Sequence, residues 1–275
     1  MRLALAALAS AGCCLLVSAC TVTQTEPMPP PEDETMTLPP APPVETPPDD
    51  SRRKPLASPD PKPPVDDGTF AEVVYVLMRD RRLGLWFCTG TLVAKDKVVT
   101  AAHCLDPKQF ESYSIVAPLA PGEPRVSASM PKTFGGDYED VANPDIGFLT
   151  LDTPIDLPSY AQLTDVVARV EAGEQLSGVA VVRTAEEPEA PLAMSQPLAL
   201  SSTVPLGYEH GFGAPYFSNG GDSGAGLFLV ENGKPTHKLI AVARQPEPDR
   251  NLDHFTRIDA EFLDWYAANN PAGGD

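Results

Sequence analysis

From Gly68 onward, short apolar runs alternate with turn-forming residues. The runs are rich in Val, Ile and Leu and are separated by Gly, Pro, Asp and Asn; they include AEVVYVLM, GTLVAKDKVVTA, DIGFLTLD, QLSGVAVVRT, AGLFLV and HKLIAVA. Short runs of this composition are typical of β-strands. A series of them with turns between favours an antiparallel sandwich or barrel over an alternating α/β fold. We therefore expect an all-β domain over residues 68–275.

The last run, DAEFLDWYAANN, has a different period. Phe262, Trp265 and Tyr266 lie at positions i, i+3 and i+4, which place them on one face of a helix. Asp259 precedes this run and can cap the first turn. The pattern predicts a short C-terminal helix that docks its apolar face on the β domain.

Residues 1–19 have the layout of a secretory signal, with one early Arg, an apolar stretch and a small-residue site. The segment VSAC, Val17–Cys20, resembles the lipobox of bacterial lipoproteins, in which cleavage before the cysteine leaves it as an acylated N-terminus. The resemblance implies that Cys20 carries lipid. Thr21 follows where an Asp would retain the protein in the inner membrane, so the outer membrane is favoured. The alternative is an ordinary signal peptide with a chance cysteine.

Residues 20–67 form the next segment, which holds 15 prolines between Thr21 and Asp67 and hardly any large apolar side chain. Such a composition cannot bury a core, and we expect a disordered, partly polyproline-II linker. At ~3.1 Å per residue it would reach on the order of 100–150 Å.

The formal charge of −18 argues against a nucleic-acid partner, because phosphate binding needs clustered Lys and Arg. Cysteine usage fits export: Cys13 and Cys14 leave with the signal and Cys20 takes lipid. Cys88 and Cys104 then remain as a pair, which an oxidising compartment permits to be a disulfide. No Cys/His spacing predicts a metal site, and no cofactor is expected.

The segment FSNGGDSGAGLF places Ser223 among glycines that leave its hydroxyl uncovered. Alone, Ser223 could be a nucleophile or an ordinary turn serine. His103, in VVTAAHC, follows a strand-like run and precedes Cys104, whose bridge would hold the imidazole in place. Asp145, in NPDIGFLTLDTPI, stands at the mouth of an apolar strand and could orient that imidazole; Asp137, Asp140 and Asp152 compete for this role.

Four segments together carry a family resemblance: TGTLVAKDKVVTAAHC, NPDIGFLTLDTPI, NGGDSGAGLF and HFTRIDAEFLDWY. Their order and spacing, from about residue 70 to 266, resemble the His, Asp, Ser and C-terminal-helix motifs of chymotrypsin/trypsin-like serine peptidases. The resemblance implies two packed six-stranded antiparallel β-barrels, joined near residues 157–172. His103 and Asp145 would come from the first barrel and Ser223 from the second.

The same resemblance implies the roles of these residues. Ser223 would attack the scissile carbonyl, His103 would take and return its proton, and Asp145 would orient His103. The backbone N–H groups of Gly221 and Ser223 would form the oxyanion hole.

The sequence also departs from the family pattern. Ala225 and Gly226 replace the usual Gly-Pro after the serine motif, Asn219 stands where a Cys is common, and the substrate-binding edge at residues 241–245 is unrecognisable. No Ile-Val-Gly-Gly activation terminus is present, so Asp222 needs another cation, for which Arg244 is the candidate.

The substrate-pocket floor differs too. Phe217 occupies the floor position at which trypsin has Asp, and Asp253 falls at a second floor position, normally Gly. A carboxylate there would favour Lys or Arg before the scissile bond. The alternative is that Asp253 belongs to a polar turn in solvent and selects nothing.

Taken together, these features predict an exported, lipid-anchored, monomeric serine endopeptidase that acts on protein or peptide substrates in the periplasm or at the cell surface. The rival prediction is a catalytically silent relative that keeps the fold as a tethered binding module. An esterase with the same three residues is a third possibility, because both reactions transfer an acyl group to water.

Overall fold

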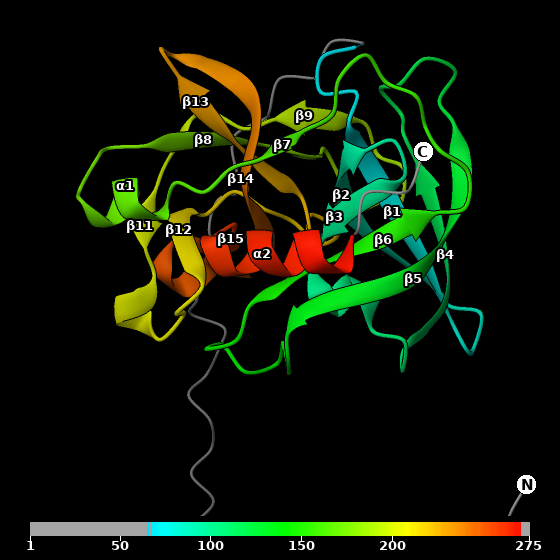
Figure 1. The fold of residues 1–275 in the computed structure, drawn as a ribbon, viewed down its shortest axis with the longest axis horizontal. Coiled ribbons are helices and arrows are strands. Elements are labelled where there is room, and N and C mark those ends of the chain that lie inside the picture. The colour runs from blue at the N-terminus through cyan, green and yellow to red at the C-terminus, as the bar shows by residue number, and fades with distance from the viewer. Residues whose placement is uncertain (1–64, 66–67, 271–275) are drawn as a thin grey trace, which may run out of the picture. The chain divides into compact units, whose positions relative to one another are not determined.

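The computed structural model describes residue 65 and residues 68–270 (Figure 1). The predicted signal peptide, Cys20 and all of the predicted linker except Val65 lie outside the described residues. Within the part that is described, no helix is long and apolar enough to cross a membrane.

The first half is a closed barrel of six antiparallel strands in the order β1-β2-β3-β6-β5-β4. The strands are β1 (Val73–Asp80), β2 (Leu85–Ala94), β3 (Lys97–Thr100), β4 (Phe110–Val116), β5 (Arg125–Gly135) and β6 (Asp145–Leu151). Strand β1 is buried on both faces: Val74 and Val76 fill the barrel, whereas Val73 and Tyr75 pack toward the second half. This explains why β1 reads as a continuous apolar run instead of an alternating one.

The second half is a nine-stranded sheet whose main path runs β10-β8-β13-β14-β15-β12-β11. Its strands are β7 (Gln162–Leu163), β8 (Ser177–Arg183), β9 (Leu192–Met194), β10 (Leu198–Ala199), β11 (Ser201–Ser202), β12 (Gly211–Pro215), β13 (Gly226–Glu231), β14 (Lys234–Glu247) and β15 (Leu252–Arg257). Strand β9 pairs with β8, and β7 adds to β14 as a parallel strand. The expected connection contains β7 and the short helix α1 (Val167–Glu171).

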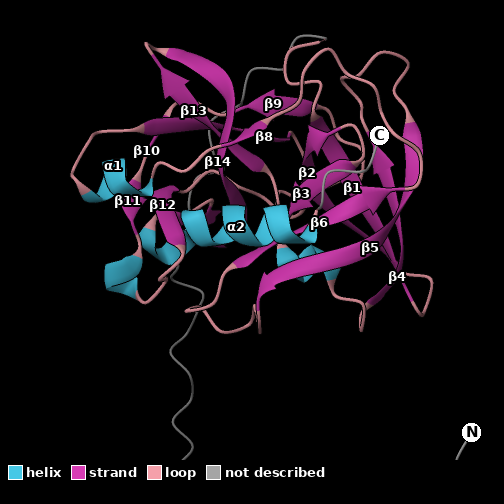
Figure 2. Cartoon of the chain, viewed as in Figure 1, coloured by secondary structure: helices cyan, strands magenta, loops and turns pink. Residues whose placement is uncertain are grey.

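A shared apolar core joins the two halves. Val99 and Phe148 of the barrel contact the same cluster as Val179, Phe228 and Val242 of the second sheet. The all-β fold class is thus confirmed, with a barrel and a sheet that meet over a common hydrophobic surface (Figure 2).

Helix α2 (Ala260–Asn269) confirms the C-terminal prediction. The carboxylate of Asp259 accepts a hydrogen bond from the N–H of Phe262 at 2.9 Å, so it is the N-cap. Phe262 is fully buried, and the rings of Trp265 and Tyr266 contact Phe148 of the barrel at 5.5 and 5.2 Å between centroids. The helix therefore docks through the face that the sequence predicts, and it lies across the junction of the two halves (Figure 1).

Candidate active site

His103 and Asp145 meet at the end of the first barrel. Asp145 is the first residue of β6, and His103 lies in the 3₁₀ turn Ala102–Leu105 that follows β3. One carboxylate oxygen of Asp145 accepts the backbone N–H of His103 at 2.8 Å, and the other lies 2.7 Å from Nδ1. A carboxylate oxygen accepts hydrogen bonds, so this contact with the buried Asp145 favours the tautomer that carries its proton on Nδ1. Nε2 is left as the basic nitrogen.

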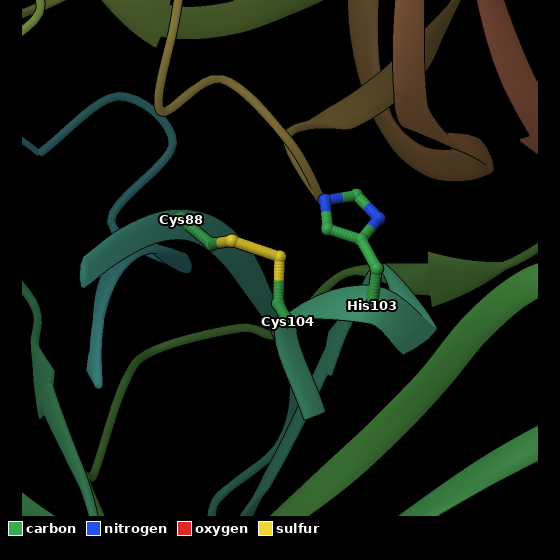
Figure 3. A group of neighbouring side chains, drawn as sticks. All are labelled: Cys88, His103 and Cys104. Carbon is green, nitrogen blue, oxygen red and sulfur yellow. A yellow bond between two sulfur atoms is a disulfide. The ribbon is translucent and has the colours of Figure 1, made fainter. Parts of the chain in front are cut away.

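A disulfide fixes the turn that carries His103. Cys88 on β2 bonds to Cys104, directly after the histidine (Figure 3), which confirms the pairing expected from the sequence. The two sulfurs and an imidazole nitrogen lie within 4.8 Å of one another, the one such group among the described His, Cys and carboxylate side chains. Since metal ions bind thiolates and these sulfurs are bonded to each other, we assign a structural role to the group.

The loop between β12 and β13 brings Ser223 over the same region. The carbonyl of Ser223 accepts the N–H of Thr89 at 2.8 Å, so the loop is bonded to β2 beside the disulfide. Gly224 has φ of +79°, and a Cβ there would collide with the side chain of Thr100 and the backbone N of Ala101. Glycine at 224 thus lets the nucleophile loop lie against the residues that lead to His103.

Two backbone N–H groups of this loop are left without a protein acceptor. In the hydrogen bonds of the described residues, each neighbouring N–H donates; these belong to Asn219, Gly220, Asp222, Gly224 and Ala225. The N–H groups of Gly221 and Ser223 donate to no protein acceptor in the described part of the chain. They are the pair that the sequence predicts as the oxyanion hole. N–H groups without a protein acceptor can donate to the negative oxygen of a reacting substrate.

The carbonyl of Gly221 is held from the opposite side. It accepts hydrogen bonds from Thr89 Oγ1, at 3.0 Å, and from the guanidinium of Arg183. Gly221 has φ of +90°, and a Cβ at this position would collide with the ring of Phe87. These contacts fix the peptide plane between Gly221 and Asp222, which lies in the chain between the N–H groups of Gly221 and Ser223.

Arg183 is also the cation that faces Asp222. Both residues are fully buried, and one carboxylate oxygen of Asp222 accepts the backbone N–H of Arg183 at 2.9 Å, so that the two residues interact through the main chain and through the attraction of their charges. The other accepts the N–H of Asn219 at 2.9 Å. Burial lowers the pKa of Arg183 to about 10, against the attraction of Asp222, which raises it. Arg183 therefore keeps its charge at neutral pH and offsets that of Asp222.

The rest of the Arg183 guanidinium is enclosed. It donates to Thr89 Oγ1 at 2.6 Å and to the carbonyl of Cys88 at 2.5 Å, and it lies 4.9 and 5.2 Å from the ring centroids of Tyr75 and Phe87. One side chain of β8 thereby ties the nucleophile loop to β2 of the other half.

Arg244, the candidate predicted for that role, lies elsewhere, which corrects the prediction. Its guanidinium donates to four backbone carbonyls of the loop before Asp145, those of Tyr138, Asp140, Val141 and Asn143. The physical reason is a register shift in the β14–β15 pairing between Ala243 and Gln245, which includes Arg244. Arg244 holds the approach to Asp145, and the structure assigns the cation that faces Asp222 to Arg183.

Asp253 lies in the same pocket as Ser223. The pocket is small, and its lining includes Ser218, Ser223, Gln245 and Asp253. Asp253 is 2% exposed, and its oxygens accept the N–H groups of Phe217 and Ser218, at 2.7 and 2.9 Å, and the Ser218 hydroxyl at 2.7 Å. The alternative of a solvent-exposed turn residue is wrong.

Phe217, the other predicted floor residue, is turned into the core. It is 6% exposed, and its ring stacks on Phe255 at 6.0 Å between centroids. A negative potential remains at this end of the site: burial raises the pKa of the Tyr216 phenol, and the carboxylates of Asp253, Glu186 and Asp222 raise it further.

Sequence reasoning missed several residues around the site. The ring of Tyr138 lies 6.3 Å from that of His103, and its hydroxyl donates to Asp106 at 2.9 Å; burial raises its pKa to about 12. Glu186 accepts the N–H of Gly220 at 3.2 Å. For Arg183 a signal did exist, since a lone charge ends the apolar run VAVVR.

Comparison with known proteins identifies the family and the fold. The model of the Trypsin family matches residues 68–266. The fold is similar to that of HL collagenase, with 14% identity and a TM-score of 0.62 over 78% of this chain and 99% of that one. It is also similar to the thermostable serine protease AL20 from an extremophilic microorganism, with 17% identity and a TM-score of 0.58 over 75% and 100% of the two chains. No curated protein sequence matches this chain.

Proposed function

The chain belongs to the trypsin family of serine proteases, and on that premise we propose that it is an endopeptidase whose nucleophile is Ser223. His103 Nε2 takes the proton of the Ser223 hydroxyl as the oxygen attacks the scissile carbonyl, and then gives it to the leaving amine. The resulting acyl-enzyme is hydrolysed by a water that His103 activates in the same way. Asp145 keeps the Nδ1 proton in place and stabilises the imidazolium.

The observation that carries this proposal is the pair of unoccupied N–H groups at Gly221 and Ser223. The neighbouring N–H groups of this loop donate to protein acceptors, whereas these two are left available to a ligand on partly exposed residues. Each free donor can stabilise the negative oxygen of the tetrahedral intermediate by about 3–4 kcal/mol. Arg183 and Thr89 fix the carbonyl of Gly221, and therefore the peptide plane that lies between the two donors, before substrate binds.

Asp253 supports a preference for Lys or Arg before the scissile bond. Its carboxylate is buried in the pocket that Ser223 lines, and three hydrogen bonds from Phe217 and Ser218 hold it there. A cationic side chain that approaches this pocket from the scissile bond would be attracted by the carboxylate of Asp253.

Export and anchoring form part of the same proposal. The lipobox-like segment ending at Cys20 supports a lipidated protein of the bacterial cell envelope, with the outer membrane favoured by Thr21. The Cys88–Cys104 disulfide supports an oxidising compartment such as the periplasm or cell surface. The residues at the site account for acyl transfer by themselves, so we assign no cofactor.

Hydrolysis of a peptide library by the purified chain tests the proposal, with Ser223→Ala as the matched control. We expect internal peptide bonds to be cleaved by the wild type only. Binding of unfolded protein without cleavage by either chain would favour the silent binding module. Hydrolysis of esters alone would favour the esterase.

A further inference from the structure

The loop that joins β1 to β2 exposes large apolar side chains at the edge of the barrel. Leu83, Leu85 and Trp86 are 75%, 48% and 49% exposed. The described residues contain seven exposed large apolar side chains, and three of them lie here, one in the loop and two at the start of β2. In Figure 1 the loop projects past the end of the barrel strands. Single exposed apolar residues need no explanation, but a projecting group of three indicates a contact surface.

The same loop carries a local positive charge. Arg79, Arg81 and Arg82 lie within four residues of one another, and Asp80 is the single acidic residue between Arg79 and Trp86. The nearest carboxylate partner from another strand is Glu111 of β4, 3.6 Å from Arg81. In a chain with 38 acidic and 20 basic residues, this loop has the opposite sign from the whole.

The loop is also held in a fixed shape. The carboxylate of Asp80 accepts the N–H groups of Arg82 and Gly84, both at 2.8 Å, and the indole N–H of Trp86 at 3.0 Å. Leu83 has φ of +65°, a left-handed conformation that costs a leucine free energy. The three hydrogen bonds occupy the Asp80 carboxylate within the turn. They stabilise the conformation in which Leu83 points outward, in spite of that cost.

We propose that the segment Arg79–Trp86, the β1–β2 tip, docks the folded domain on a bilayer surface that contains anionic lipid. Leu83 and Leu85 would enter the boundary of the acyl chains, Trp86 would lie at the level of the headgroups, and the arginines would bind lipid phosphates. A convex tip with an outward leucine suits a soft interface, whereas a protein partner would need a matching cavity. The positive sign of the tip on a negative protein complements the negative surface of such a bilayer.

This contact is independent of the proposed lipid on Cys20 and of catalysis. It also has a consequence for the site, because Phe87, which follows Trp86, lies against Gly221. Docking through the β1–β2 tip places the candidate active site close to the bilayer surface, where it would meet polypeptides that emerge from or lie on the membrane.

Tryptophan fluorescence tests the contact, because the chain has only Trp86 and Trp265. Trp265 packs on Phe134 and Phe148 and serves as the internal reference. The full-length chain is mixed with vesicles of brominated phosphatidylcholine, with and without phosphatidylglycerol. We expect quenching and a blue shift with the anionic vesicles, both weakened by salt and both absent in Trp86→Phe.

The number of arginines in the tip sets the expected size of the effect on binding to anionic vesicles. Each Arg near an anionic surface contributes roughly fivefold to partitioning, so Arg81→Gln with Arg82→Gln should lower the ratio of quenched to unquenched Trp86 about 25-fold. Lys234→Gln with Arg250→Gln removes the same charge from other exposed positions and should leave the ratio unchanged.

Three results would overturn the proposal. Equal quenching in the wild type and Trp86→Phe would show that the β1–β2 tip does not enter the bilayer. Equal quenching with and without phosphatidylglycerol would remove the role of charge. A spectral change with polyglutamate but not with vesicles would assign the tip to an acidic polypeptide.

Discussion

Replacement of Arg183 by methionine should damage both stability and catalysis. Methionine keeps an unbranched apolar side chain at this position, beside the rings of Tyr75 and Phe87, but it removes the guanidinium. The positive charge near the buried Asp222 is then lost, and Gly221 loses one of the two groups that hold its carbonyl. The substitution thus removes a buried positive charge and also one of the contacts that hold the loop of Gly221 and Ser223.

The structure sets the expected magnitude. Loss of the guanidinium leaves the carbonyls of Cys88 and Gly221 without this donor and removes a buried positive charge near Asp222, and a loss of this kind costs about 3–5 kcal/mol of unfolding free energy. Loss of a correctly placed oxyanion donor lowers kcat about 10²–10³-fold. We expect both effects in Arg183→Met, with KM changed far less than kcat, because the loop acts on the transition state.

Urea unfolding and active-site titration measure the two effects. Arg169→Met is the control: Arg169 is exposed and pairs with Glu174, and such surface pairs contribute about 0–1 kcal/mol. Adding Asp222→Asn to Arg183→Met should recover part of the lost stability, since it removes the uncompensated charge. The reasoning is refuted if Arg183→Met unfolds within about 1 kcal/mol of the wild type and keeps its kcat.

Three further outcomes follow from the structure. Cys88→Ser with Cys104→Ser should lower the unfolding free energy by about 3 kcal/mol, the value for a closed loop of this size, since the cysteines are 16 residues apart; calorimetry with equal stability of the two chains would contradict this. Asp253→Ser should abolish a preference for Lys or Arg in a peptide-library profile, and an unchanged profile would show that Asp253 only anchors the Phe217–Ser218 turn. Asp259→Ala should cost about 1 kcal/mol through loss of the α2 cap. Burial raises the pKa of Asp259, but hydrogen bonds from Phe262, His210 and Arg257 outweigh it and lower the pKa below 3.8, so this contribution is present above about pH 4 and is lost as the pH falls through the folded-state pKa. A wild-type minus variant difference that does not shrink in acid would contradict that assignment.

Local sequence signals predicted much of the fold and site. The cap at Asp259, the apolar face of α2 and the position of Asp145 at the start of a strand each depend on neighbours within a few residues. The same is true of the turn that follows Val98 and Val99. Strands of two or three residues in the second sheet, such as β10 and β11, gave no such signal because they are shorter than any apolar period.

The partner of Asp222 could not be read from the sequence because it depends on tertiary arrangement. Arg183 is 39 residues from Asp222 and 95 from Cys88, and the three meet only when β8 pairs with β13 and packs beside β2. Arg244 is nearer to Asp222 in sequence, but it binds backbone carbonyls of the loop before Asp145. It lies at a register shift in the β14–β15 pairing that no local sequence pattern predicted.

Labelling with a fluorophosphonate tests the central claim most directly, because the reagent bonds to a serine hydroxyl only when that hydroxyl is activated as a nucleophile. We predict one adduct per wild-type chain, mapped by mass spectrometry to Ser223, and no adduct in folded His103→Ala or Ser223→Ala. A folded wild-type chain without an adduct at Ser223, or with equal labelling in His103→Ala, would contradict the account.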